Sequence, residues 1–227
     1  MNMKYNEQEI QFLKDEINEM WKLVISQIEK SKKALLNNDV ELALEIISLE
    51  KRVDAYELRL DSNCEHYIAL YNPVAIDLRL VLSIMKISIT LERIADYVAG
   101  IARYVVETEC YPFTLKMKEA LELEKMFDVL LSMMTDSLVS LNSENSKNAG
   151  KILAKDNVVD EFYHKAIDLL AEQITKETND IRCGLEMMVL IRKMERIGDH
   201  CSNIVEEIVF YIEAKVLKHK GNKINLK

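Results

Sequence analysis

Pairs of acidic residues four positions apart occur at equivalent places in the two halves of the chain. The segment "TLERIADYVAGI" contains Glu92 and Asp96, and "KMERIGDHCSNI" contains Glu195 and Asp199. Residues four apart lie one turn apart on the same side of an α-helix, so each pair presents two carboxylates on one face. Like charges at this spacing destabilise a helix by about a few tenths of a kcal/mol, so each pair calls for a compensating charge.

A second acidic pair with the same spacing precedes each of these motifs. If the helices that carry the two pairs of one half are antiparallel neighbours, four carboxylates meet at one level. Four converging carboxylates cannot all stay ionised without a cation, and oxygen ligands favour magnesium, calcium, manganese or iron. The predicted ligands are Glu50, Asp54, Glu92 and Asp96 in the first half, and Asp156, Asp160, Glu195 and Asp199 in the second.

Three other interpretations need no metal, or use it differently. In the first, Arg93 and Arg196 neutralise the acids at the surface. In the second, the protein is a metal-free interaction module, and the carboxylate rows form an acidic surface for basic patches on a partner. In the third, the protein is a di-metal carboxylate enzyme, which requires a Glu-x-x-His motif on each of two helices. The sequence has one such motif, Glu161 to His164, and the matching stretch from Ala55 to Leu58 lacks histidine.

Familiar catalytic motifs are absent from the sequence. There is no GxSxG motif and no glycine-rich phosphate loop, and the chain has 4 histidines. A metal bound without catalytic groups would be structural or regulatory, so we expect a protein that is not an enzyme.

The composition predicts long helices to position these acids. The 227 residues include 5 glycines and 2 prolines, and the abundant Leu, Ile, Glu, Lys and Ala suit helices better than strands. Turn signals such as "NND", "YNP" and "CYPF" divide the chain into six predicted helices. These run from about Tyr5 to Leu36, Asp39 to Tyr71, Val74 to Thr108, Thr114 to Leu141, Ala149 to Lys176, and 178 to Leu217, with a frayed tail over 218–227.

An internal repeat organises the six helices into two sets of three. Glu92-Arg93-Ile94 matches Glu195-Arg196-Ile197 at an offset of 103 residues. We therefore predict an all-α protein of two tandem antiparallel three-helix bundles, over residues 1–110 and 111–227. The third and sixth helices each carry a heptad seam that predicts a core face. The seams are Ile84, Ile87, Leu91, Ile94, Val98, Ile101 and Val105, and Met187, Leu190, Met194, Ile197, Cys201, Ile204 and Ile208.

Net charge and cysteine spacing indicate which partners and which cellular compartment to expect. The formal net charge of −8 argues against nucleic acid as the main partner. The polar N-terminus does not resemble a signal peptide, and charged residues interrupt the most apolar stretch, 78–101, so we expect no membrane span. Without CxxC spacing, free thiols in a reducing cytoplasm are favoured over disulfides. The cysteines are Cys64, Cys110, Cys183 and Cys201.

The twin motifs "LERIADYVAGI" and "MERIGDHCSNI", with "NPVAIDLR" before the first, resemble the PhoU family of phosphate-signalling regulators. The similarity covers nearly the whole chain. The family commonly reads "RIGDxxxNI", and the second half keeps Gly198, Asp199 and Asn203. The first half departs from this pattern, with Ala95 and Gly100 at the glycine and asparagine positions. If the asparagine supports metal binding, the first site is the weaker one.

The resemblance implies a regulatory role. Such proteins are cytoplasmic, reach the inner face of the membrane through their partners, and form homodimers. They connect the ATPase of a phosphate ABC transporter to a sensor histidine kinase, repress the phosphate-starvation response when phosphate is plentiful, and modulate phosphate uptake. The resemblance also implies that the eight acids bind metal clusters, for which iron, manganese, magnesium and zinc are candidates.

Overall fold

The structure, a computed structural model, describes residues 3–217, with side chains described from residue 6. Within that range the chain is almost entirely helical and has no strand, which confirms the all-α prediction. The predicted tail at 218–227 lies outside the described residues. The elements are α1 (Met3–Asn37), α2 (Val40–Tyr71), α3 (Ala75–Glu107), α4 (Tyr111–Met117), α5 (Leu123–Asn142), α6 (Ala149–Lys176), the 3-10 helix η1 (Thr178–Asp180) and α7 (Ile181–Glu213).

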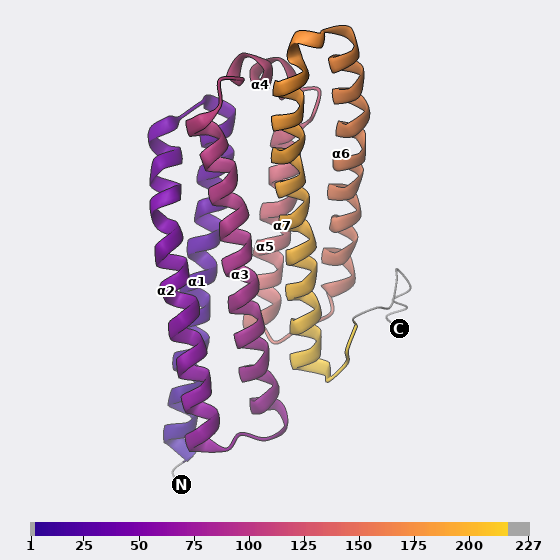
Figure 1. The fold of residues 1–227 in the computed structure, drawn as a ribbon. Coiled ribbons are helices and arrows are strands. Elements are labelled where there is room, and N and C mark those ends of the chain that lie inside the picture. The colour runs from indigo at the N-terminus through magenta and orange to yellow at the C-terminus, as the bar shows by residue number, and fades with distance from the viewer. Residues whose placement is uncertain (1–2, 218–227) are drawn as a thin grey trace.

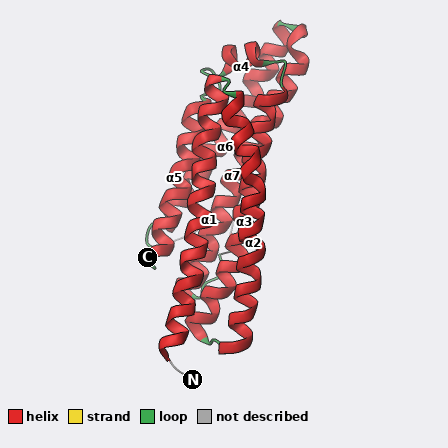
Figure 2. Cartoon of the chain, turned by 90° about the vertical axis from the view of Figure 1, so that its left-hand side faces the viewer, coloured by secondary structure: helices red, strands yellow, loops and turns green. Residues whose placement is uncertain are grey.

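The long helices form two three-helix bundles that lie side by side (Figure 1). Helices α1, α2 and α3 make the first bundle, and α5, α6 and α7 make the second. Helix α3 packs against α7, so α2, α3, α7 and α6 follow one another in one layer, while α1 and α5 pack behind them. Figure 2 shows from the side that the long helices run nearly parallel or antiparallel along the whole molecule. The predicted division at residues 110 and 111 stays a prediction.

Helices α3 and α7 are the central pair, and they run in opposite directions (Figure 1). All fourteen residues of the two predicted seams are buried, which confirms the heptad interpretation. The bundles also join behind this pair, where the buried indole Nε1 of Trp21 donates to the carbonyl oxygen of Met134 at 3.2 Å. The two repeats therefore share one continuous hydrophobic core.

The prediction of one helix from Thr114 to Leu141 was wrong. The chain instead forms the short helix α4, a turn, and then α5. Glu122 takes a left-handed backbone conformation with φ 51°, and its carboxylate pairs with Lys125 and Lys165. Leu121 and Leu123 are both buried on either side of it. In a continuous helix, side chains two positions apart point about 200° away from each other, to nearly opposite sides. The break in the helix lets both leucines reach the core.

The prediction of free thiols was wrong for two of the four cysteines. Cys110 and Cys183 form a disulfide with a Cα–Cα distance of 5.3 Å, whereas Cys64 and Cys201 are free and buried. The bonded residues are 73 positions apart, and no spacing motif links them. The fold brings them together because α3 ends, and α7 begins, at the same end of the molecule (Figure 1). The disulfide therefore bonds the segment between α3 and α4 covalently to the start of α7 in the second bundle.

None of the helices in the described part of the chain is both long enough and apolar enough to span a membrane.

Candidate metal centre

The first acidic cluster lies between α2 and α3. Helix α2 carries Glu50 and Asp54, and the adjacent, antiparallel helix α3 carries Glu92 and Asp96. Burial, together with the charges of Asp96 and Asp54, raises the pKa of Glu92 to about 6. Burial also raises the pKa of Asp96, with additional contributions from Glu50 and Asp54. The carboxylates of α2 thus act on those of α3 across the two helices, while their role as metal ligands stays a prediction.

The second cluster repeats this arrangement between α6 and α7. Asp156 and Asp160 lie on α6, and Glu195 and Asp199 lie on α7. Burial raises the pKa of Asp156 to about 6, against the lowering effect of its hydrogen bond with Ser202 and with smaller contributions from the charges of Asp160 and Asp199. Burial and the charge of Asp199 raise the pKa of both Asp160 and Glu195. The fold therefore places the second set of predicted acids on adjacent helices, where their charges affect one another.

Gly198 allows α6 and α7 to approach closely at the second cluster. A Cβ atom at this position would lie 2.8 Å from Oδ1 of Asp156 and 3.2 Å from Cγ1 of Val159. Real Cβ atoms essentially never come within 3.0 Å of another heavy atom, so any larger residue would push α6 outward. The glycine of the "RIGD" motif is thus explained by helix packing, and the first half has the buried Ala95 at the same place.

Two buried carboxylate oxygens of the second cluster have no hydrogen-bond partner. They are Oδ1 of Asp156 and Oε2 of Glu195, and Glu195 is only 7% exposed. The other oxygen of Asp156, Oδ2, accepts a hydrogen bond from Oγ of Ser202 at 2.8 Å. A buried carboxylate oxygen without a donor carries a desolvation cost that a hard cation would offset.

Ser202 was missed by the sequence analysis, although a signal was present. It lies seven residues after Glu195, which places the two on the same face of α7. The equivalent position in α3 is Ala99, which has no hydroxyl group. The second cluster is therefore the better supported of the two.

Arginines pair with three of the eight acids. Nη1 of Arg196 lies 2.9 Å from Oδ2 of Asp199, and Nη1 of Arg192 lies 2.8 Å from Oε1 of Glu195. In the first cluster, Nη1 of Arg103 lies 2.9 Å from Oε2 of Glu50. The expectation that Arg196 neutralises an acid is thus met in this structure. Arg93 acts more weakly, through a charge that opposes the raised pKa of Glu92.

The donor types of the second cluster suit a hard metal ion, because they are carboxylate oxygens alone and two of them are buried without a hydrogen bond. The side chains of this cluster do not form a coordination shell in this structure. Across residues 3–217, no three Asp, Glu, His or Cys side chains come together as a complete metal site. Arg192 and Arg196 occupy oxygens of Glu195 and Asp199 that such a site would use.

His200 lies between the two clusters. Its ring stacks on that of Tyr97, with the ring centroids 5.6 Å apart. Tyr97 and His200 are 103 residues apart, which is the offset of the repeat. Equivalent residues of the two repeats therefore meet where α3 packs against α7. Burial lowers the pKa of His200, and the charge of Arg93 lowers it further.

The residues considered for a di-metal enzyme do not form part of either cluster's core. Glu161 and His164 are both exposed, and the ring of His164 meets the neighbouring Tyr163 edge-on. His164 affects the site only through its charge, which lowers the pKa of Asp160 against the effect of burial. No observation in the described residues therefore favours the enzyme interpretation.

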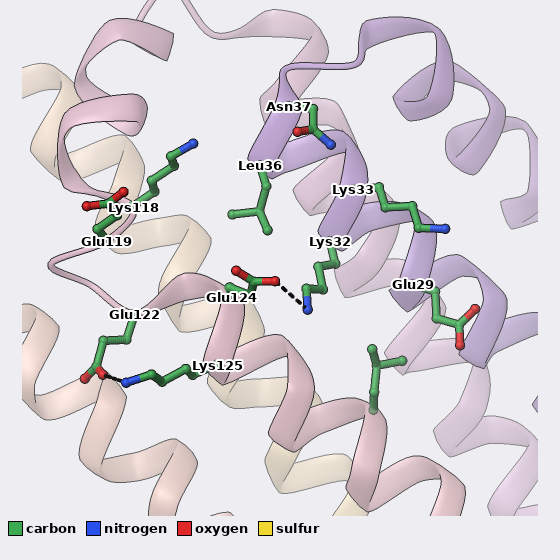
Figure 3. Close-up of a pocket in the computed structure, with 11 residues that line it drawn as sticks. Glu29, Lys32, Lys33, Leu36, Asn37, Lys118, Glu119, Glu122, Glu124 and Lys125 are labelled. Atoms are coloured by element: carbon green, nitrogen blue, oxygen red, sulfur yellow. Dashed lines mark hydrogen bonds and ion pairs between the residues drawn. The ribbon is translucent and has the colours of Figure 1, made fainter.

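A pocket lies away from both clusters, between the end of α1 and the α4–α5 turn (Figure 3). Its volume is about 920 Å³, and lysines and glutamates of both signs line it. Nζ of Lys32 lies 3.1 Å from Oε1 of Glu124, and Lys125 pairs with Glu122. Because these charges already pair with one another, the pocket has no clear preference for an anion or a cation.

These features define a protein of two repeated three-helix bundles with one acidic cluster in each. The chain belongs to the PhoU family, since the PhoU domain matches residues 17–105 and 123–208, one match in each bundle. The resemblance inferred from the paired motifs is thereby confirmed.

Relatives of similar length carry the same family name. A phosphate-specific transport system accessory protein PhoU homolog from Aquifex aeolicus is 32% identical over 216 residues, covering 95% of this chain and 96% of the relative. The phosphate-specific transport system accessory protein PhoU from Escherichia coli is 30% identical and covers 94% and 87%.

Solved structures agree with the fold. The phosphate transport system regulatory protein PhoU from Streptococcus pneumoniae is 28% identical with a TM-score of 0.82, covering 93% of this chain and 99% of that one. PhoU from Pseudomonas aeruginosa is 25% identical with a TM-score of 0.83, covering 92% and 99%.

Proposed function

We propose that this protein regulates phosphate transport and represses the phosphate-starvation response when phosphate is plentiful. The observation that carries the proposal is the family match in both bundles, together with relatives of nearly equal length named phosphate-specific transport system accessory proteins. In this role the protein couples the ATPase of a phosphate ABC transporter to a sensor histidine kinase. It is a cytoplasmic homodimer that reaches the membrane through these partners and has no catalytic activity of its own.

Deletion in the native host tests this role. With phosphate in excess, the deletion strain should express phosphate-starvation genes at the level of starved wild-type cells. A plasmid copy of the wild-type gene should restore repression and serves as the control. Correct repression in the deletion strain would overturn the proposal.

We also propose that the two acidic clusters bind metal ions, among which iron, manganese, magnesium and zinc are candidates. The support is the placement of four acids on adjacent helices of each bundle and the two buried oxygens of the second cluster that accept no hydrogen bond. When bound, a cation would supply charge neutralisation and a link between adjacent helices. The ligands would be Glu50, Asp54, Glu92 and Asp96 in one cluster, and Asp156, Asp160, Glu195 and Asp199 in the other.

Elemental analysis of the purified protein tests the metal proposal. The eight-fold Asn/Gln variant should lose the bound metal while its circular dichroism spectrum stays helical. Equal metal content in the variant and the wild type would remove the assignment. A wild-type protein without metal would favour the metal-free interpretations, and the three arginine–carboxylate pairs support the one in which arginines neutralise the acids.

A further inference from the structure

The segment that links the two bundles is joined to α7 by a covalent bond and by an exposed ion pair. Cys110, between α3 and α4, is bonded to Cys183 in the first turn of α7. Next to the bond, Nη1 of Arg182 lies 3.6 Å from Oε2 of Glu109. These two side chains are 71% and 83% exposed, so their ion pair adds little stability. The disulfide is therefore the stronger of the two connections.

The short helix α4 is held to the core without the disulfide. Phe113, Thr114 and Met117 of α4 are buried. The hydroxyl oxygens of Tyr104 and Thr114 are 2.7 Å apart, and one donates to the other. Opening the bond therefore releases the residues around Cys110 while α4 and both bundles stay packed.

The two halves of the disulfide differ in exposure. Cys110 is buried, with 4% of its surface exposed. Cys183 is partly exposed and directly follows the exposed residues Ile181 and Arg182. Thiol–disulfide exchange requires an attacking thiolate to reach one sulfur of the bond. Cys183 is therefore the side of the bond that a reductant can reach.

The two free cysteines do not compete for this chemistry. Cys64 and Cys201 are both 0% exposed. Burial, together with the charges of Asp61 and Glu16, raises the pKa of the Cys64 thiol to about 12, and burial also raises the pKa of Cys201. Because the thiolate is the reactive form of cysteine, both residues are inert at neutral pH.

We propose that the bond between Cys110 and Cys183 is a reversible modification site, at which a protein dithiol reductant releases the segment between α3 and α4 from the start of α7. The inference rests on the cytoplasmic location proposed above, because disulfides in the cytosol are usually transient and redox-sensing. The structure holds the oxidised form of the site.

The exchange takes place in two steps. A thiolate of the dithiol attacks the sulfur of Cys183, the S–S bond breaks, and Cys110 leaves as a thiolate that takes up a proton. The second thiolate of the reductant then attacks the mixed disulfide and releases Cys183, which is protonated in turn. Two electrons pass from the dithiol to the cysteine pair, and the reductant leaves as a disulfide. Glutathione disulfide reverses the reaction and is itself reduced to two glutathione thiols.

The bond also closes one end of a groove between α3 and α7. Thr108 and Arg182, which lie close to the two cysteines in the sequence, line this groove of about 410 Å³ together with Glu186. Oγ1 of Thr108 donates to Oε2 of Glu186 at 3.2 Å and joins the end of α3 to α7. In the reduced form, polar contacts of this kind hold the end of the groove in place of the covalent bond. The redox state therefore changes how firmly the groove is closed.

Trapping with a thioredoxin variant tests which sulfur is attacked. The variant lacks its second, resolving cysteine, so a mixed disulfide with the full-length protein persists and peptide mass spectrometry locates it. The adduct should form at Cys183 about tenfold more often than at Cys110, because Cys110 is buried. The double variant Cys110→Ser/Cys183→Ser is the control and should form no adduct.

Hydrogen–deuterium exchange measures the release of the segment. Reduction by wild-type thioredoxin, with its reductase and NADPH, should speed exchange severalfold in peptides covering 107–112 and 178–185. The buried seams of α3 and α7 should keep their exchange rates. The matched control is again Cys110→Ser/Cys183→Ser, which should show the fast rates with and without the reductant.

Each outcome decides the proposal separately from the phosphate role. A bond that resists reduced thioredoxin in the folded protein, and opens only in denaturant, is structural and overturns the proposal. Equal exchange rates in the oxidised and reduced protein also overturn it, because nothing is then released. Adducts mainly at Cys110 overturn the assignment of Cys183 as the attacked residue. Both measurements use purified protein, so they are independent of the deletion strain that tests the phosphate role.

Discussion

Gly198 of α7 faces Asp156 of α6 so closely that a single added methyl group would lie 2.8 Å from a carboxylate oxygen. The contact joins the motif glycine to a predicted ligand from the other helix. The absence of a side chain at Gly198 therefore lets α6 approach α7 and brings Asp156 close to α7.

The substitution Gly198→Ala should destabilise the protein. The new Cβ would force α6 away from α7 at Asp156 and Val159, and overpacking of this kind costs about 1–3 kcal/mol. Urea denaturation measures the loss in the free energy of unfolding.

Gly100→Ala is the matched control for that substitution. Its Cβ would meet only the flexible end of the Lys193 side chain, at 3.0 Å, and a mid-helix glycine costs about 1 kcal/mol relative to alanine. Gly100→Ala should therefore be neutral or stabilising. Equal destabilisation by both changes would show that the close approach at Gly198 is not special.

The pKa of Asp156 predicts a specific pH dependence in chelator-treated protein. Its value in the folded state is about 6, against an ordinary value of 3.8, because the carboxyl is buried. Between these values the folded state holds a proton that the unfolded state has released. The stabilising contribution is therefore present at low pH and is lost as the pH rises through about 6.

Asp156→Asn should remove this dependence. The variant should gain about 1–2 kcal/mol in the free energy of unfolding at pH 7.5, since the amide is never charged. At pH 4 it should match the wild type. Asp168→Asn, at an exposed position of the same helix, should change stability by less than about 0.5 kcal/mol at either pH. A gain that is equal at pH 4 and pH 7.5 would contradict the raised pKa.

The disulfide between Cys110 and Cys183 should be detectable by thiol titration in denaturant. Two thiols, those of Cys64 and Cys201, should react before reduction and four after it. The double variant Cys110→Ser/Cys183→Ser should lose about 2–4 kcal/mol in the free energy of unfolding, because the bond closes a long loop. Dithiothreitol should lower wild-type stability to that of the variant and leave the variant unchanged. Four reactive thiols without reduction would contradict the bond.

Local sequence patterns predicted much of the fold. The heptad seams of α3 and α7 predicted the buried faces, because a helix in a bundle must bury one continuous stripe. The duplicated acid spacing predicted which carboxylates share a helix face, because helix geometry fixes this, while their role as ligands stays a prediction.

The features that the sequence did not reveal depend on contacts between distant segments. The break at Glu122 lacks a glycine or proline, and it arises from the burial of both Leu121 and Leu123. The disulfide joins residues 73 positions apart. The pairing of Arg192 with Glu195 depends on side-chain rotamers, which no spacing rule determines.

The most direct test of the account is a crystal structure of the protein saturated with Mn²⁺, with anomalous scattering data collected for manganese. The account predicts an anomalous peak between α6 and α7, within coordination distance of Asp156, Asp160, Glu195 and Asp199. An empty map between these helices would contradict it.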